Sequence, residues 1–158
     1  MHLDETELRT RLKDVQERIN IAAARTKRNP AEINLLGVSK NQSIVKIDYF
    51  HKNGLESFGE NRVQELREKY KERPEYKWHF IGHLQRNKVK YLLRMENCVL
   101  INSLDSWSLA EEIDKRAARQ NRVMPVLLQV NVAGDEKKYG IEAGGVEGFL
   151  GGARKLRN

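Results

Sequence analysis

The chain has 158 residues, of which 39% are hydrophobic and 32% charged, and its formal net charge is +7. This length is enough for one folded domain with a core, and no apolar run reaches the roughly 20 residues that a membrane span requires. The single cysteine, Cys98, excludes an intrachain disulfide; it lies in a short apolar run and is expected to be a buried, unreactive thiol. We expect a cytoplasmic protein with no membrane partner.

The positive charge is mostly interspersed with acidic residues. The stretch 67–73 mixes Arg, Lys and Glu in the way that is typical of exposed helix faces. A local exception is the segment 86–90, where Arg86 and Lys88 stand at the start of a predicted helix. These two cations could face an anion or could be solvated. Because no known nucleic-acid-binding module is present, we expect no specific nucleic-acid partner.

The first predicted element is a long amphipathic helix over residues 4–28. Its apolar residues recur at helical spacing: Leu8, Leu12, Val15, Ile19 and Ala22. A short capped turn follows, with Asn29 as the cap and Pro30 at the first position.

Strands and helices then alternate. The predicted strands cover 33–38, 56–58, 78–81, 99–101 and 125–130, and the predicted helices cover 42–53, 61–72, 84–94, 106–119 and 142–157. Such alternation at short spacing indicates parallel βαβ units, and strands this apolar are typical of a sheet buried on both faces. The sequence therefore predicts a single α/β domain over residues 1–158.

Ligands of such folds bind at the carboxyl ends of the strands. Lys40 ends the first apolar run, and a charged ammonium at the end of a buried strand is costly unless it is used or paired. Lys40 is therefore a candidate Schiff-base or nucleophilic lysine; the alternative is a lysine that extends into water. Asn61, after the second strand, is either a ligand-binding amide or an ordinary helix N-cap.

Two histidines, His79 and His83, are four residues apart near the third strand. A zinc-binding helix of the H-E-x-x-H kind needs a glutamate after the first histidine, but Phe80 stands there and Gly82 interrupts the helix. We therefore predict no metal site. A histidine inside a strand is more often a core residue whose hydrogen bonds are satisfied, and this is the expectation for His79 from its position alone.

Taken together, five segments resemble the pyridoxal 5′-phosphate (PLP) homeostasis protein family, in the family's order and spacing. They are 36–40 (LGVSK), 58–61 (FGEN), 78–88 (WHFIGHLQRNK), 128–131 (LQVN) and 138–140 (KYG). The third segment is highly specific.

The resemblance implies a (β/α)8 TIM-type barrel like the N-terminal domain of alanine racemase. It also implies that PLP is held as a Schiff base on Lys40, with Asn61, His79 and Gly82 lining the cofactor ring. Members of the family are thought to buffer PLP and deliver it, which makes PLP-dependent apoenzymes the implied partners. No robust enzymatic activity is attributed to them. A racemase would need a second catalytic base, which we do not find.

The chain departs from the family in length, since a barrel of this type needs about 250 residues and eight strands and we count five. The strands that would supply the phosphate-binding loops are missing, so the chain looks truncated at its C-terminus. Two hypotheses follow. Either the chain is a PLP carrier that uses Lys40, or it is a half-barrel that no longer binds PLP and self-associates through its open edges.

Overall fold

The computed structural model describes residues 4–135 and 137–158. Five parallel strands form one sheet in the order in which they occur along the chain. They are β1 (Leu36–Val38), β2 (Ser57–Glu60), β3 (Lys77–Phe80), β4 (Cys98–Leu104) and β5 (Val126–Leu128). Each strand lies beside its predecessor because a helix returns the chain to the same end of the sheet. The predicted fold, with five of the eight strands of a (β/α) barrel, is confirmed.

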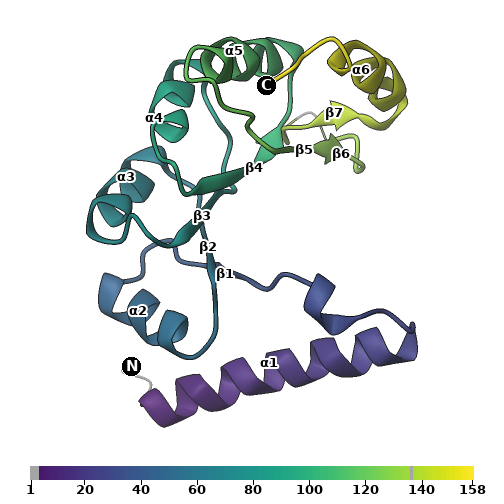
Figure 1. The fold of residues 1–158 in the computed structure, drawn as a ribbon. Helices are drawn as coiled ribbons and strands as arrows, with labels where there is room; N and C mark the ends of the chain where they lie inside the picture. Colours follow the sequence, from purple (N-terminus) through teal and green to yellow (C-terminus); the bar gives the residue numbers. More distant parts are fainter. Residues whose placement is uncertain (1–3, 136) are drawn as a thin grey trace.

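The helices between these strands lie along the outer side of the curved sheet (Figure 1). The α-helices are α1 (Glu5–Arg25), α2 (Ile44–Lys52), α3 (Val63–Glu72), α4 (Val89–Leu93), α5 (Trp107–Ala118) and α6 (Val146–Ala153). Three short 3₁₀ turns join them: η1 (Pro30–Glu32), η2 (Arg86–Lys88) and η3 (Ala143–Gly145). Within the described ranges, no helix is both long and apolar enough to cross a membrane.

Two predicted elements are divided in the structure. The predicted helix 84–94 begins as the 3₁₀ turn η2 and becomes α-helical only in α4. The predicted strand 125–130 separates into β5 and β6 (Val130–Asn131), because β6 leaves the main sheet to pair in parallel with β7 (Ile141–Glu142). Gln129 marks the junction: its amide donates to the carbonyl of Leu104, while its own carbonyl accepts from Ile141.

The two faces of the sheet differ in burial. On the outer face, Phe58, Trp78 and Phe80 are at most 2% exposed and pack under the helices. On the inner face, Val38 is 54% exposed and Leu127 is 50% exposed. The prediction that the strands are buried on both faces is therefore wrong for the inner face. The inner face is exposed because the five strands form a curved sheet that does not close, so no further strands cover the barrel interior.

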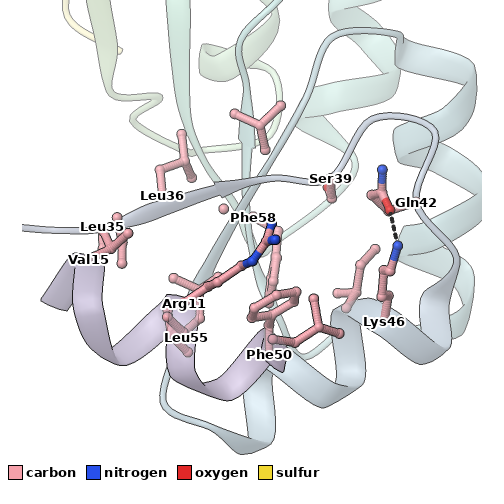
Figure 2. A pocket seen from close by; sticks show the side chains of 15 residues that line it. Arg11, Val15, Leu35, Leu36, Ser39, Gln42, Lys46, Phe50, Leu55 and Phe58 are labelled. Carbon is pink, nitrogen blue, oxygen red and sulfur yellow. Dashed lines mark hydrogen bonds between the residues drawn. The ribbon is translucent and has the colours of Figure 1, made fainter. Parts of the chain in front are cut away.

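Helix α1 is attached more loosely than its pattern predicted. Leu8 and Leu12 are buried, but Val15 is 39% exposed and Ala22 is also exposed. A cavity of about 480 Å³ lies between α1, β1 and α2, and Val15 borders it. Figure 2 shows that the cavity is enclosed mainly by aliphatic and aromatic side chains from these three elements. Beyond Leu12 the apolar stripe is therefore covered only in part, since Ile19 is half-buried and the neighbouring Ala23 is buried.

Arg122 holds the connection between α4 and β4 in place. The guanidinium of Arg122 donates to four backbone carbonyls around the α4–β4 connection, those of Leu93, Met95, Glu96 and Cys98. Cys98 itself is fully buried, as predicted. Burial raises the pKa of its thiol to about 12, and the nearby charge of Arg122 only partly opposes this shift. The thiol is therefore protonated and unreactive at neutral pH.

Candidate functional site

Lys40 lies in a turn two residues beyond the end of β1, and its side chain is exposed. Among the described residues it makes no hydrogen bond or ion pair. The strand end is therefore not covered at the inner face of the open sheet, and the side chain of Lys40 extends from it. The accessible ammonium is not held by a neighbour, and its amine is free to meet a ligand or to extend into water.

The backbone on both sides of Lys40 is held firmly. Ser39 is buried; its amide donates to the carbonyl of Gly59 at 3.0 Å, and its hydroxyl donates to Oε1 of Glu60 at 2.7 Å. On the other side, the amide of Asn41 donates to Oε1 of Glu65 at 2.7 Å. Asn41 has a φ of 58°, in the left-handed region that asparagine tolerates better than most residues. A mobile lysine side chain is thus mounted on a fixed turn.

A buried ion pair supports this turn from below. Glu60 is fully buried and Lys69 is 7% exposed. Nζ of Lys69 lies 2.6 Å from Oε1 of Glu60, 2.8 Å from Oε1 of Glu65 and 2.6 Å from the carbonyl oxygen of Ser39. An ammonium group has three N–H donors, so these three acceptors satisfy it completely. We call these four residues the Lys69 cluster.

Glu65 responds electrostatically to the cluster. Burial alone would raise the pKa of its carboxyl, but the hydrogen bonds from Lys69 and from the Asn41 amide outweigh burial. The pKa of Glu65 is therefore lowered, and the carboxylate is ionised at neutral pH. The sequence interpretation of 67–73 as an exposed helix face is wrong at Lys69. The four-residue spacing of Glu65 and Lys69 is typical of an ion pair, but nothing in the local pattern indicated its burial.

Asn61 and Gly82 meet at the carboxyl ends of β2 and β3. A Cβ atom at Gly82 would lie 2.1 Å from the backbone oxygen of Asn61, a distance that no side chain tolerates. Glycine is therefore required for this close approach. The N-cap of α3 is Arg62, which excludes the interpretation of Asn61 as the helix cap. The Asn61 side chain remains available for other contacts.

His79 lies on β3, opposite Gly59 on β2 and Leu100 on β4. Asn102 follows Leu100 by two residues and so shares its side of the strand. Nδ1 of His79 and Oδ1 of Asn102 are buried, and neither has a hydrogen-bond partner among the described residues. The expectation of a satisfied core histidine is therefore wrong. Both side chains offer a polar atom to a group bound at the inner face.

The ionisation of His79 is set mainly by its surroundings. Burial lowers the pKa of the imidazole, while the side chain of Asn102 acts in the opposite direction with a smaller effect. A lowered pKa means that the ring is neutral at physiological pH, with one nitrogen as donor and the other as acceptor. His79 can therefore form a neutral hydrogen bond, although it cannot supply a positive charge.

The structure brings together only some of the four predicted site residues. Asn61 and Gly82 are in contact, and His79 precedes Gly82 by three residues in the same strand-and-loop segment. Lys40 is on the neighbouring turn and makes no hydrogen bond to any of the other three. The residues that sequence reasoning missed are Lys69, which supports the turn, and Asn102, which lies beside His79.

His83 is placed outside this group. Its Nδ1 lies 2.8 Å from Oδ2 of Asp105, and its ring stacks on Tyr139 with centroids 3.6 Å apart. The two histidines therefore lie in different surroundings: His79 is on the inner face of the sheet and His83 is at its exposed rim. In the part of the chain that the structure describes, no three His, Cys, Asp or Glu residues are arranged to hold a metal ion.

The Lys69 cluster leads to a prediction about stability. Lys69→Met should lower the free energy of unfolding by about 3–5 kcal/mol, because Glu60 would keep a buried charge without its partner. Lys71→Met, an exposed position on the same helix, is the control and should change it by less than about 0.5 kcal/mol. Urea denaturation followed by circular dichroism measures both. Equal effects for the two variants would contradict a structural role for the cluster.

His79 leads to a prediction about pH. The pKa of His79 is lower in the folded chain than the ordinary 6.5. Between the folded pKa and pH 6.5, the folded state therefore binds fewer protons at this residue than the unfolded state does. Stability from this residue is complete above pH 6.5 and decreases as pH falls through the folded pKa. Unfolding free energies measured between neutral and mildly acidic pH should show this decrease.

The matched variants are His79→Gln and His51→Gln. His79→Gln should make the loss of unfolding free energy at acidic pH smaller. His51→Gln should leave that loss unchanged, because His51 lies on the outer side, stacked on Tyr76. A decrease that persists unchanged in His79→Gln would disprove the assignment.

Comparison with known proteins supplies the context of this site. No family model matches the chain. The pyridoxal phosphate homeostasis protein of Aquifex aeolicus is 49% identical over 134 residues, which cover 84% of this chain and 58% of that protein. The human protein of the same name is 36% identical over 140 residues, covering 82% of this chain and 51% of that protein. The chain thus spans only about half the length of these curated relatives.

Solved structures agree with the fold. A protein of unknown function from Bifidobacterium adolescentis aligns with a TM-score of 0.83 at 28% identity, over 98% of this chain and 68% of that one. PipY of Synechococcus elongatus, solved with PLP bound, aligns with a TM-score of 0.73 at 33% identity, over 90% of this chain and 65% of that one. On this evidence, the chain belongs to the pyridoxal phosphate homeostasis protein family.

Proposed function

We propose that the chain binds PLP through Lys40, as a Schiff base, and takes part in PLP homeostasis in the cytoplasm. The observation that carries the proposal is the accessible side chain of Lys40, unpaired within the described ranges, on a turn whose two flanking residues, Ser39 and Asn41, are fixed. The names of the relatives and the PLP bound to PipY support the choice of ligand.

The chemistry required of the chain is simple. PLP supplies an aldehyde that condenses with a neutral amine; a C=N bond forms at Nζ of Lys40 and one water molecule leaves. When a second amine attacks the same carbon, a new C=N bond forms to that amine, the bond to Nζ breaks, and Lys40 leaves as the free amine. An exposed lysine suits this exchange because a competing amine can reach it. We therefore propose a carrier that passes PLP to apoenzymes, rather than an enzyme that keeps it buried.

Other residues would position the ring rather than react with it. Asn61 offers a donor and an acceptor at the carboxyl end of β2. Gly82, which has no side chain, lies against the Asn61 backbone. His79 and Asn102 each have one buried polar atom available. This donor set fits a flat, polar heterocycle. The phosphate group would need positive charge from elsewhere, because the lowered pKa of His79 leaves its ring neutral.

The test compares Lys40→Ala with Lys46→Ala. Lys46 is the control because it lies on α2, close in sequence, with its ammonium donating to Gln42 at 2.9 Å. Adding PLP should give the visible absorption band of a Schiff base with the wild-type chain and with Lys46→Ala, and Lys40→Ala should lose it. An unchanged band in Lys40→Ala would mean that another amine carries the cofactor and would refute the proposal.

A second candidate function is self-association without PLP binding. The observation in its favour is the half-exposed inner face, with Val38 and Leu127 at least 50% exposed, next to the outer edges of β1 and β5. Unpaired strand edges tend to pair with other chains. Sedimentation velocity should then show a dimer or larger species that increases with protein concentration. A single monomeric species at every concentration would eliminate this candidate.

A further inference from the structure

A second pocket, which Lys40 does not line, lies between α3 and the η2–α4 segment. Its volume is about 310 Å³. Three cations line it: Arg62 and Arg67 from the start and middle of α3, and Lys88 from η2. The remaining lining residues are neutral or aromatic apart from His83, and none carries a carboxylate. The pocket therefore has strongly positive walls.

The positive charges are crowded around one aromatic ring. The guanidinium of Arg67 lies 4.3 Å from the ring centre of Tyr91, the ammonium of Lys90 at 5.0 Å and that of Lys88 at 5.7 Å. Each cation is attracted to the ring by about 0.5–1 kcal/mol at an exposed site, but like charges repel one another. Among the described residues, these three cations and Arg62 form no ion pair. An anion in the pocket would relieve the repulsion.

The nearby carboxylates are engaged elsewhere. Glu65 accepts from Lys69 and from the Asn41 amide, and Glu68 accepts from Gln64 at 2.8 Å. The charge of Arg62 also acts on Glu65, as a minor contribution to its lowered pKa, but the two form no ion pair. Arg67 donates one N–H to Gln64 at 3.4 Å. A guanidinium has five N–H donors, so most of those on Arg67 remain available. Stacking on Tyr91 also holds the group in place, which reduces the entropy lost when it binds a ligand.

We propose that this pocket binds a phosphate group, either free phosphate or a small phosphate monoester. Two guanidinium groups and one ammonium match a doubly charged phosphate better than a singly charged carboxylate, and arginine forks fit phosphate oxygens. The site is distinct from the proposed Lys40 site, since Lys40 does not line it and only Asn61 is shared. It assigns a role to Lys88, which the sequence left between an anion contact and a solvated charge.

The experiment is isothermal titration calorimetry of the purified chain, at constant ionic strength, with inorganic phosphate in one arm and phenyl phosphate in the other. Saturable binding is expected in at least one arm. Arg67→Gln and Lys88→Gln should each weaken it by about tenfold or more, the loss typical of a charge-assisted hydrogen bond. Tighter binding of phenyl phosphate would identify an ester as the ligand class, weaker binding would identify free phosphate, and equal binding would show that the pocket recognises the phosphate group alone.

Lys90→Gln is the matched control. It removes a cation that lies 5.0 Å from the same ring but does not line the pocket, so binding should stay within about twofold of wild type, as for a change in long-range charge alone. Circular dichroism of each variant checks folding. Lys40→Ala should also bind phosphate normally, so failure of the proposed PLP function would leave this result intact. Absence of saturable binding in both arms, or an equal loss in Lys90→Gln and Lys88→Gln, would overturn the proposal.

Discussion

The site described here depends on the buried ammonium of Lys69. Its three N–H donors are shared among Glu60, Glu65 and the carbonyl of Ser39, which join the end of β1, the end of β2 and helix α3. Burying these charges is expensive. The ammonium is fully hydrogen-bonded, whereas Oε2 of Glu60 is buried without a hydrogen-bond partner among the described residues. Because the acceptors come from three elements, the cluster fixes the turn that carries Lys40. We infer that the hydrogen bonds of the cluster hold the backbone of the turn in place, while the side chain of Lys40 on that turn stays free to move.

The open sheet explains the other unusual features. A closed barrel would bury the inner ends of its strands, whereas here Val38 is more than half exposed and Lys40 is accessible. In the part of the chain that the structure describes, His79 and Asn102 keep buried polar atoms without partners, which is rare in protein interiors and calls for an explanation such as a functional role. Accessible lysine and available polar atoms on one inner face suit a protein that holds a small molecule reversibly. The same openness leaves β1 and β5 as the edge strands of the sheet.

Much of the fold was predictable from local patterns. The alternation of apolar runs with helical segments located all five strands of the main sheet, and the asparagine cap was correct: Oδ1 of Asn29 accepts from the amide of Ala31 at 3.0 Å. Sequence reasoning failed where burial depends on distant parts of the chain. Lys69 lies in a run of alternating charges that resembles a solvated surface, yet two carboxylates from outside that run enclose it. Val15 was predicted to face the core because apolar spacing shows which face of a helix turns inward, but not whether anything covers it.

We propose that the fixed turn presents Lys40, above all other lysines, to PLP. The most direct measurement is borohydride reduction of the PLP-treated chain followed by mass mapping of the peptides at limiting PLP. We expect a reduced adduct concentrated on Lys40, with the exposed lysines of the helices modified only at excess reagent. An adduct spread evenly over many surface lysines would contradict it, and would mean that the turn confers no preference on Lys40.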